Sequence, residues 1–120
     1  MRSSWIEHKG KMIFYQDFSK NFYDSAAVKA GLAEVQKIVT AQPLNSMRVL
    51  SDFRDTNVGS DLLSAMNTAS AATKAHVNKT AVLGVTGMKR KLADLLTALT
   101  GQPFKYFDDI EAAKDWLAED

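Results

Sequence analysis

The chain has 120 residues, of which 46% are hydrophobic, and it contains no cysteine. Its length suits one domain with a core of its own, and the lack of cysteine excludes disulfides, thiolate catalysis and cysteine-ligated metal sites. The 15 lysines and arginines nearly balance the 14 acidic residues at a net charge of +1, which argues against a nucleic-acid-binding surface.

The first residues predict an antiparallel hairpin followed by a helix. β-prone runs at residues 5–8 and 12–16 flank the glycine-centred turn Lys9-Gly10-Lys11, a pattern typical of two strands joined by a tight turn. The helix is predicted between residues 24 and 40, and Pro43 ends its pattern. Its apolar side chains recur at helical spacing at Val28, Leu32, Val35 and Val39.

The middle of the chain predicts a second strand and a second helix. Residues 47–53 read as a strand, and the turn-forming residues Asp55-Thr56-Asn57 and Gly59 follow it. The helix is expected from about residue 60 to residue 76. Its expected buried side consists of Leu62, Leu63, Met66 and Ala69.

The last third predicts a strand, a helix, a strand and a helix in turn. Residues 81–85 form an apolar run typical of a strand covered on both faces. Leucines at helical spacing then predict a helix that ends at Gly101 and Pro103; they are Leu92, Leu95, Leu96 and Leu99. A strand at residues 104–107 precedes the final helix, which has Asp108 and Glu111 as a predicted capping pair. The apolar stripe of that helix is Ile110, Ala113, Trp116 and Leu117.

This order of elements predicts an α/β fold. Alternating strands and helices with short connections favour right-handed crossovers onto a mixed, mostly parallel sheet of about five strands. The opening hairpin adds an antiparallel edge, and the pattern contains four helices. No linker or repeat divides the chain, so we expect a single domain over residues 1–120. Residues 1–10 lack the apolar core of a signal peptide and no segment reaches transmembrane length, so we expect a cytoplasmic protein.

Two loops are candidates for function, because ligands of open α/β sheets bind beyond the carboxyl ends of the parallel strands. The first loop, residues 52–60, lies between a predicted strand and a predicted helix. Its polar side chains are Asp52, Arg54, Asp55, Thr56, Asn57 and Ser60. Turns and helix caps prefer the same residue types, so a purely structural role is the alternative.

The second loop, residues 84–91, ends in three adjacent cations, Lys89, Arg90 and Lys91. The dipole of a helix disfavours positive charge in its first turn by about 0.3–1 kcal/mol per residue, and a bound anion would offset that cost. The spacing is not that of a P-loop. We therefore predict an anion site formed by Thr86, Gly87, Lys89 and Arg90, with a solvated charged turn as the alternative.

The residues predict no catalytic, cofactor or metal site. His8 and His76 have no second ligand at the spacing of a metal site. The acidic residues near the end of the chain occupy positions where they cap a helix or complement its dipole. No nucleophile, base and orienting group come together, so we expect a protein that is not an enzyme.

Three segments resemble the SpoIIAA-like branch of the STAS superfamily. They are residues 47–53 (MRVLSDF), residues 80–90 (TAVLGVTGMKR) and residues 107–117 (FDDIEAAKDWL). The resemblance spans nearly the whole chain and implies a two-layer SpoIIAA-like fold without catalytic activity. Anti-sigma-factor antagonists of this superfamily are switched by phosphorylation of a hydroxyl at the start of the helix after the third strand, where the added charge blocks docking. The match places Asn57 at that position, so the neighbouring Thr56 and Ser60 are the candidate phosphoacceptors.

The expected function is that of a non-catalytic regulatory or protein-interaction domain. Its expected interaction surface consists of Asp52, Arg54, Asp55, Asn57, Leu62, Leu63 and Met66. The partner is an unidentified protein or a second copy of this chain, which would give a homodimer. The alternative is a small-ligand module that holds an anionic metabolite or a lipid between the two loops and the apolar face of the sheet. Neither hypothesis involves nucleic acid or a cofactor.

Overall fold

The computed structural model describes residues 3–85 and 104–119. One sheet holds five strands in the order of the sequence: β1 (Ser4–His8), β2 (Lys11–Asp17), β3 (Met47–Asp52), β4 (Val77–Leu83) and β5 (Phe104–Phe107). β1 and β2 are antiparallel, and every other pair of neighbours is parallel. The predicted mixed sheet with its opening hairpin is confirmed.

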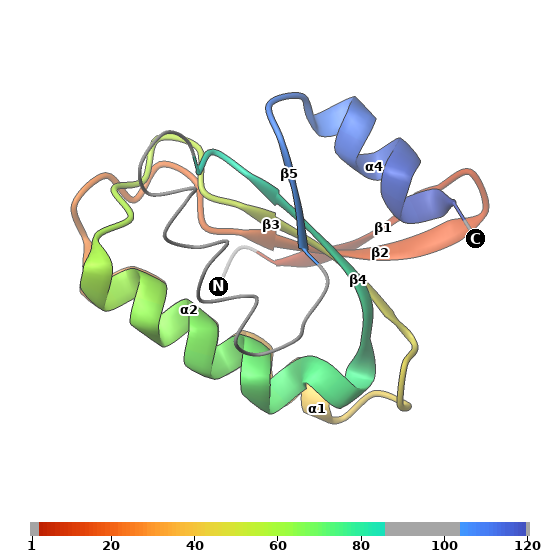
Figure 1. The fold of residues 1–120 in the computed structure, drawn as a ribbon, viewed down its shortest axis with the longest axis horizontal. Coiled ribbons are helices and arrows are strands. Elements are labelled where there is room, and N and C mark those ends of the chain that lie inside the picture. Colours follow the sequence, from red (N-terminus) through yellow and green to blue (C-terminus); the bar gives the residue numbers. More distant parts are fainter. Residues whose placement is uncertain (1–2, 86–103, 120) are drawn as a thin grey trace.

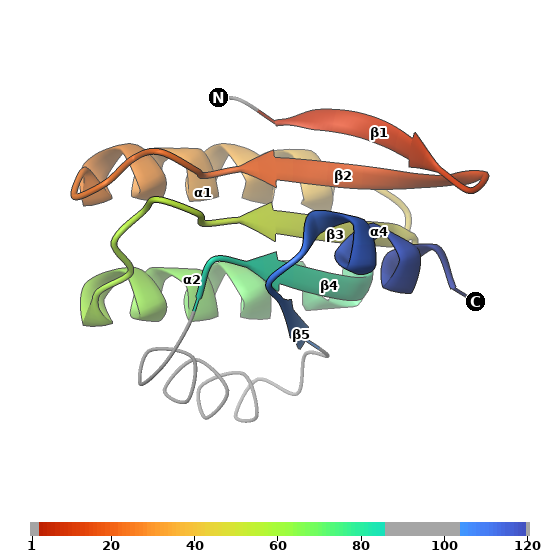
Figure 2. The ribbon, with the colours of Figure 1, turned by 90° about the horizontal axis from the view of Figure 1, so that it is seen from above.

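Helices cover both faces of this sheet. α1 (Ser25–Thr40) and α2 (Ser60–Thr73) lie side by side on one face, and α4 (Ile110–Ala118) lies on the other (Figures 1 and 2). The described residues thus form three layers, a sheet between two α-helices on one face and one on the other, whereas a two-layer fold with four helices was expected. The predicted helix with Leu92, Leu95, Leu96 and Leu99 lies outside the described residues. The two-layer prediction was wrong because α4 follows the last strand, so no crossover rule holds it to the face of α1 and α2.

Alternate side chains of the central strands enter two separate apolar cores. On β3, Val49 faces α1 and α2 in a core with Phe14, Phe53 and Leu62. The neighbouring Leu50 faces α4 in a smaller core with Ile13, Leu83, Ala113 and Leu117. Both faces of the central strands are covered, which explains why they read as nearly continuous apolar runs.

The ends of the helices depart from the sequence prediction by a few residues. Asp24 caps α1 by accepting a hydrogen bond from the Ala27 N–H at 3.1 Å. Asp109, rather than the predicted Asp108, caps α4 by accepting from the Ala112 N–H at 3.0 Å. α2 ends at Thr73, and the three-residue 3-10 turn η1 (Lys74–His76) leads into β4. That strand begins four residues before the predicted apolar run, because its first half contains the polar Asn78 and Lys79.

Candidate functional site

Two loops meet at the carboxyl edge of the sheet, where β2 and β3 end (Figure 1). Residues 18–24 connect β2 to α1, and residues 52–59 include the end of β3 and lead to α2. The backbone N–H groups of Phe18, Lys20 and Phe22 each donate to a carbonyl oxygen of the second loop, at 2.9, 2.9 and 3.0 Å. We refer to residues 18–24 and 52–59 as the joined loops.

The side chain of Thr56 fastens the joined loops from within. Its hydroxyl donates to the Phe18 carbonyl oxygen at 2.5 Å and accepts from the Asn21 N–H at 3.1 Å. Beneath them the buried rings of Phe18 and Phe53 stack with centroids 5.0 Å apart. Because backbone, hydroxyl and ring contacts all link the two segments, they form one unit anchored in the core.

Phe22 is held at the tip of this unit in an unusual backbone conformation. Its φ is 50°, in the left-handed region, where a bulky side chain costs on the order of 1–3 kcal/mol. Its N–H donates to the Asp55 carbonyl, and its own carbonyl accepts from the Asn57 N–H at 2.5 Å. The strained conformation does not bury the aromatic side chains within the chain, since Phe22 is 61% exposed and the adjacent Tyr23 is 85% exposed.

Asp52 lies at the base of the joined loops and has no exposed surface. Its carboxylate accepts from the Tyr15 hydroxyl at 2.6 Å. It also accepts from Arg54 through Nη2 at 2.7 Å, Nε at 3.0 Å and the backbone N–H at 3.0 Å. The Arg54 side chain remains 48% exposed at the surface, so a buried carboxylate orients a cation that faces solvent.

Hydrogen bonding in this trio sets its protonation states. Burial by itself favours the neutral form of Asp52, but the hydrogen bonds from Arg54 and Tyr15 outweigh it and lower the Asp52 pKa. Burial and the adjacent carboxylate raise the pKa of Tyr15 to about 12. The hydrogen bond to Asp52 raises the pKa of the Arg54 guanidinium. Asp52 is therefore a charged structural anchor at neutral pH and not a candidate general base.

The end of β4 abuts the joined loops at Gly84. This residue has φ +86°, and a Cβ added to it would lie 2.5 Å from the Arg54 nitrogen and 2.6 Å from the Phe53 carbonyl carbon. Only glycine therefore permits this backbone contact. It supports the segment of the joined loops from which Arg54 projects.

The structure corrects part of the predicted interaction surface. Asp52, Leu62 and Leu63 are buried. Asp52 is enclosed by its hydrogen bonds with Tyr15 and Arg54. The two leucines pack into the core between the sheet and the helices α1 and α2. Met66 is partly buried against the same core. The exposed members of the predicted surface are Arg54, Asp55 and Asn57.

The two candidate phosphoacceptors differ in accessibility. Thr56 is only partly exposed and its hydroxyl makes the two hydrogen bonds of the joined loops. Ser60 is exposed and is the first residue of α2. The predicted anion site of Thr86, Gly87, Lys89 and Arg90 lies outside the described residues.

Sequence reasoning missed the aromatic pair Phe22-Tyr23 and the role of Tyr15. Periodicity could not find the pair, because it lies in a segment that is neither helix nor strand. Its signal is compositional: two adjacent aromatic residues follow the turn-forming run Ser19-Lys20-Asn21. Tyr15 reads as an ordinary strand residue.

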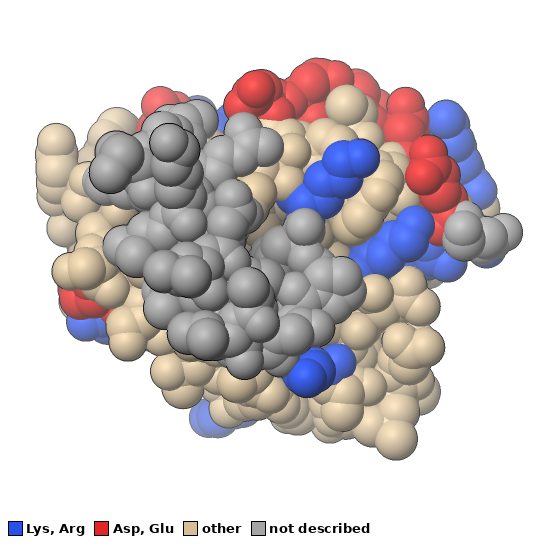
Figure 3. All heavy atoms as spheres, in the orientation of Figure 1, with Lys and Arg blue, Asp and Glu red and all other residues tan. Residues whose placement is uncertain are grey.

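Acidic side chains gather over α4 in the view of Figure 3, and several of them have structural roles. Asp109 caps the helix, and Asp115 pairs with His8 at 2.7 Å and Lys9 at 2.9 Å in the opening hairpin. His76 contacts the Gln42 carbonyl oxygen at 2.7 Å. Within residues 3–85 and 104–119, no three His, Cys, Asp or Glu side chains are grouped as a metal site. No helix in the same residues is long and apolar enough to span a membrane.

Comparisons with known proteins agree with this architecture. The family model described as SpoIIAA-like matches residues 12–118. The chain belongs to the SpoIIAA-like family. A crystal structure of an uncharacterized DUF3478-family protein with a SpoIIAA-like fold, from Shewanella loihica PV-4, superimposes with a TM-score of 0.67 at 13% identity. The match covers 97% of this chain and 92% of the other. No curated protein matches the sequence.

Proposed function

We propose that this SpoIIAA-like domain is a non-catalytic interaction module that binds a protein partner through the joined loops. The observation that carries the proposal is Phe22, which is fixed in a left-handed conformation by hydrogen bonds on both sides while 61% of it is exposed. Backbone strain of this kind persists where the surrounding structure imposes it, and it concentrates at functional sites.

The chemistry of the surface supports a protein as the partner. Phe22 and Tyr23 present aromatic area that a partner can bury, and aromatic residues dominate the binding energy of protein interfaces. Arg54, oriented by Asp52, and the exposed Asp55 lie on the neighbouring loop. They supply charges that can select a complementary partner. The pairing of Asp52 with Arg54 and Tyr15 supports a structural rather than a catalytic use of this edge.

Regulation by phosphorylation fits Ser60 better than Thr56. A phosphate on Ser60 adds up to about two negative charges beside the joined loops, and the exposed hydroxyl can reach a kinase without unfolding. A phosphate on Thr56 would require the two hydrogen bonds of its hydroxyl to break first.

Quantitative affinity capture from the native cell tests the proposal with a matched control. A Phe22→Ser/Tyr23→Ser double variant removes the aromatic pair, whereas Leu44→Ser removes a residue that is 71% exposed and lies on the α1–β3 connection. We expect partner binding to weaken about 30-fold in the double variant, the loss of one or two interface hot spots, and to be unchanged in Leu44→Ser. Circular dichroism checks that both variants fold. Equal capture by all three proteins would contradict the proposal.

A further inference from the structure

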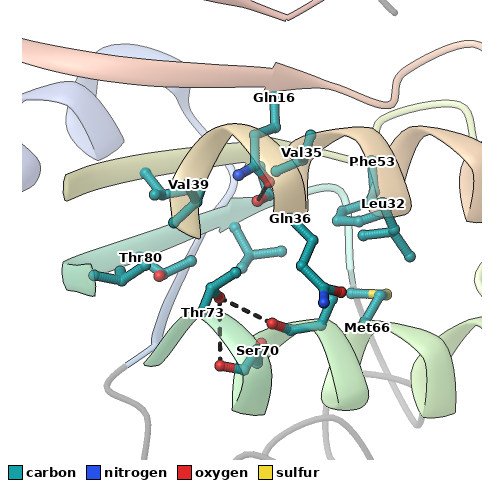
Figure 4. A pocket seen from close by; sticks show the side chains of 15 residues that line it. Gln16, Leu32, Val35, Gln36, Val39, Phe53, Met66, Ser70, Thr73 and Thr80 are labelled. Atoms are coloured by element: carbon teal, nitrogen blue, oxygen red, sulfur yellow. Dashed lines mark hydrogen bonds between the residues drawn. The ribbon is translucent and has the colours of Figure 1, made fainter. Parts of the chain in front are cut away.

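A small pocket lies between the sheet and the two helices α1 and α2 (Figure 4). Its cavity volume is about 60 Å³, room for about four to six water-sized groups at 10–15 Å³ each. Apolar side chains such as Val35, Val39 and Met66 form most of its wall. None of the described residues that line it carries a charge.

The polar groups of the pocket come from the sheet and from both helices, including Gln36 on α1 and Ser70 on α2 (Figure 4). Ser51 and Thr73 are both buried and line it. The Thr73 hydroxyl is used within its own helix, where it donates to the Ala69 carbonyl at 2.9 Å. The Ser51 hydroxyl donates to Gln16 Oε1 at 2.8 Å. Gln16 therefore has its amide oxygen occupied.

The amide nitrogen of Gln16 is a hydrogen-bond donor in the wall of the pocket. Gln16 is only 7% exposed and its side chain points from β2 toward the pocket (Figure 4). Its Nε2 makes no hydrogen bond to any residue in the part of the chain that the structure describes. Gln16 Nε2 is therefore a donor that an acceptor oxygen inside the pocket can reach, and a hydrogen bond between them would be favourable among mostly apolar side chains.

We propose that this pocket binds a small uncharged molecule with an apolar end and a carbonyl or ether oxygen, and that Gln16 Nε2 donates to that oxygen. The apolar wall accommodates the hydrocarbon part, and the volume limits the buried portion to about five heavy atoms. The uncharged lining disfavours an anionic ligand, because no positive charge in the described wall would compensate a buried carboxylate. This site shares the buried Phe53 with the joined loops but lies apart from their exposed tip at Phe22 and Tyr23.

Two probes of equal heavy-atom count test the site, 2-butanone as the uncharged molecule and propanoate as the anion. Titration of the ¹⁵N-labelled full chain, followed by amide NMR shifts, should give saturable changes at Ser51 and Thr73 with 2-butanone and none with propanoate. Gln16→Met keeps the size of the side chain and removes the donor, and it should weaken 2-butanone binding about fivefold.

Matched leucine substitutions on α2 provide the control. Ala69→Leu fills the pocket and should abolish the shifts, whereas Ala71→Leu makes the same change at an exposed position of the same helix and should leave them intact. No saturable shift with 2-butanone, equal binding of propanoate, or binding that survives in both Ala69→Leu and Gln16→Met would overturn the proposal.

Discussion

The hydroxyl of Thr56 donates a hydrogen bond over 2.5 Å to the carbonyl oxygen of Phe18, which lies 38 residues earlier in the chain. The hydroxyl oxygen of Thr56 also accepts a hydrogen bond from the Asn21 N–H at 3.1 Å. One small side chain thus satisfies two backbone groups of the other loop. The exposed position of Phe22 depends on this link, because Phe22 lies immediately after Asn21.

Removing the Thr56 hydroxyl should destabilise the domain. Thr56→Val keeps the shape of the side chain but leaves the Phe18 carbonyl and the Asn21 N–H without their partner, so we expect the free energy of unfolding to fall by about 1–3 kcal/mol. Thr56→Ser keeps the hydroxyl and should lose less than about 1 kcal/mol, the value of one methyl group. Urea denaturation measures both changes. Equal stability of Thr56→Val and the native chain would mean that the hydroxyl does not hold the loops.

Negative charge should have opposite effects at the two candidate phosphoacceptors. Ser60→Glu places a carboxylate at the start of α2 and should stabilise the domain by about 0.3–1 kcal/mol, whereas Thr56→Glu should lower stability because it disrupts the joined loops. Ser64→Glu, at an exposed position one turn further along α2, is the control and should have little effect. Urea denaturation compares the three variants. Phosphosite mapping of the chain from its native cell should find the modification on Ser60; a phosphate on Thr56 instead would contradict this prediction.

Substitution of two glycines with positive φ distinguishes the cost of backbone strain from the cost of a steric clash. Gly10→Ala, at φ +79° in open space, should cost about 1–2 kcal/mol for the left-handed conformation alone. Gly84→Ala adds a clash with the backbone of Phe53 and Arg54 and should cost at least about 2 kcal/mol more. Thermal unfolding of the two variants measures the difference. Equal losses would show that the loops can shift away from β4 at no cost.

The burial of the Tyr15 hydroxyl and its contact with Asp52 should make stability fall at alkaline pH. The folded-state pKa of Tyr15, about 12, lies above its unfolded value of 10.0, so the stability that this group contributes is fully present below pH 10 and is lost as the pH rises toward 12. Tyr15→Phe cannot ionise. We therefore expect the native chain to lose more stability than Tyr15→Phe between pH 10 and pH 12, as measured by urea denaturation at each pH, and parallel curves would refute the expectation.

The contribution of Asp52 to stability depends on pH in the opposite direction. Its folded-state pKa is lowered, so its contribution is present above the unfolded pKa and is lost as the pH falls through the folded one. The acid limb of the stability curve thus reports the hydrogen bonds of Asp52 with Arg54 and Tyr15, and the alkaline limb reports the Tyr15 hydroxyl.

Most strands and helices that the structure describes could be predicted from local patterns in the sequence. The opening hairpin follows from a glycine-centred turn between two β-prone runs, and α1 follows from the regular period of its apolar side chains. Leu62 and Leu63 fitted both a buried helix face and an exposed partner surface, and only their burial beneath α1 separates the two interpretations. Periodicity alone does not specify which helices share a face.

The candidate site could be predicted only in outline. The rule that function gathers at the carboxyl edge of the sheet located residues 52–60, but the joined loops depend on hydrogen bonds between Phe22, Asn57 and other residues about 35 positions apart. Such bonds leave no local pattern in the sequence. The sequence also does not predict that Phe22 adopts a left-handed φ, since its hydrogen-bonding partners in residues 52–59 impose that conformation.

The order of strands in the sheet has a consequence for how the chain is made. Each strand pairs with the one that precedes it in the sequence, so a chain emerging from the ribosome can add every new strand to an edge that already exists. No earlier pairing has to open to admit a later strand, which shortens the time during which the growing edge is exposed to other chains. The aromatic tip at Phe22 and Tyr23 is synthesised before its hydrogen-bonding partners in residues 52–59. The left-handed conformation of Phe22 can therefore be fixed only after β3 has joined the sheet.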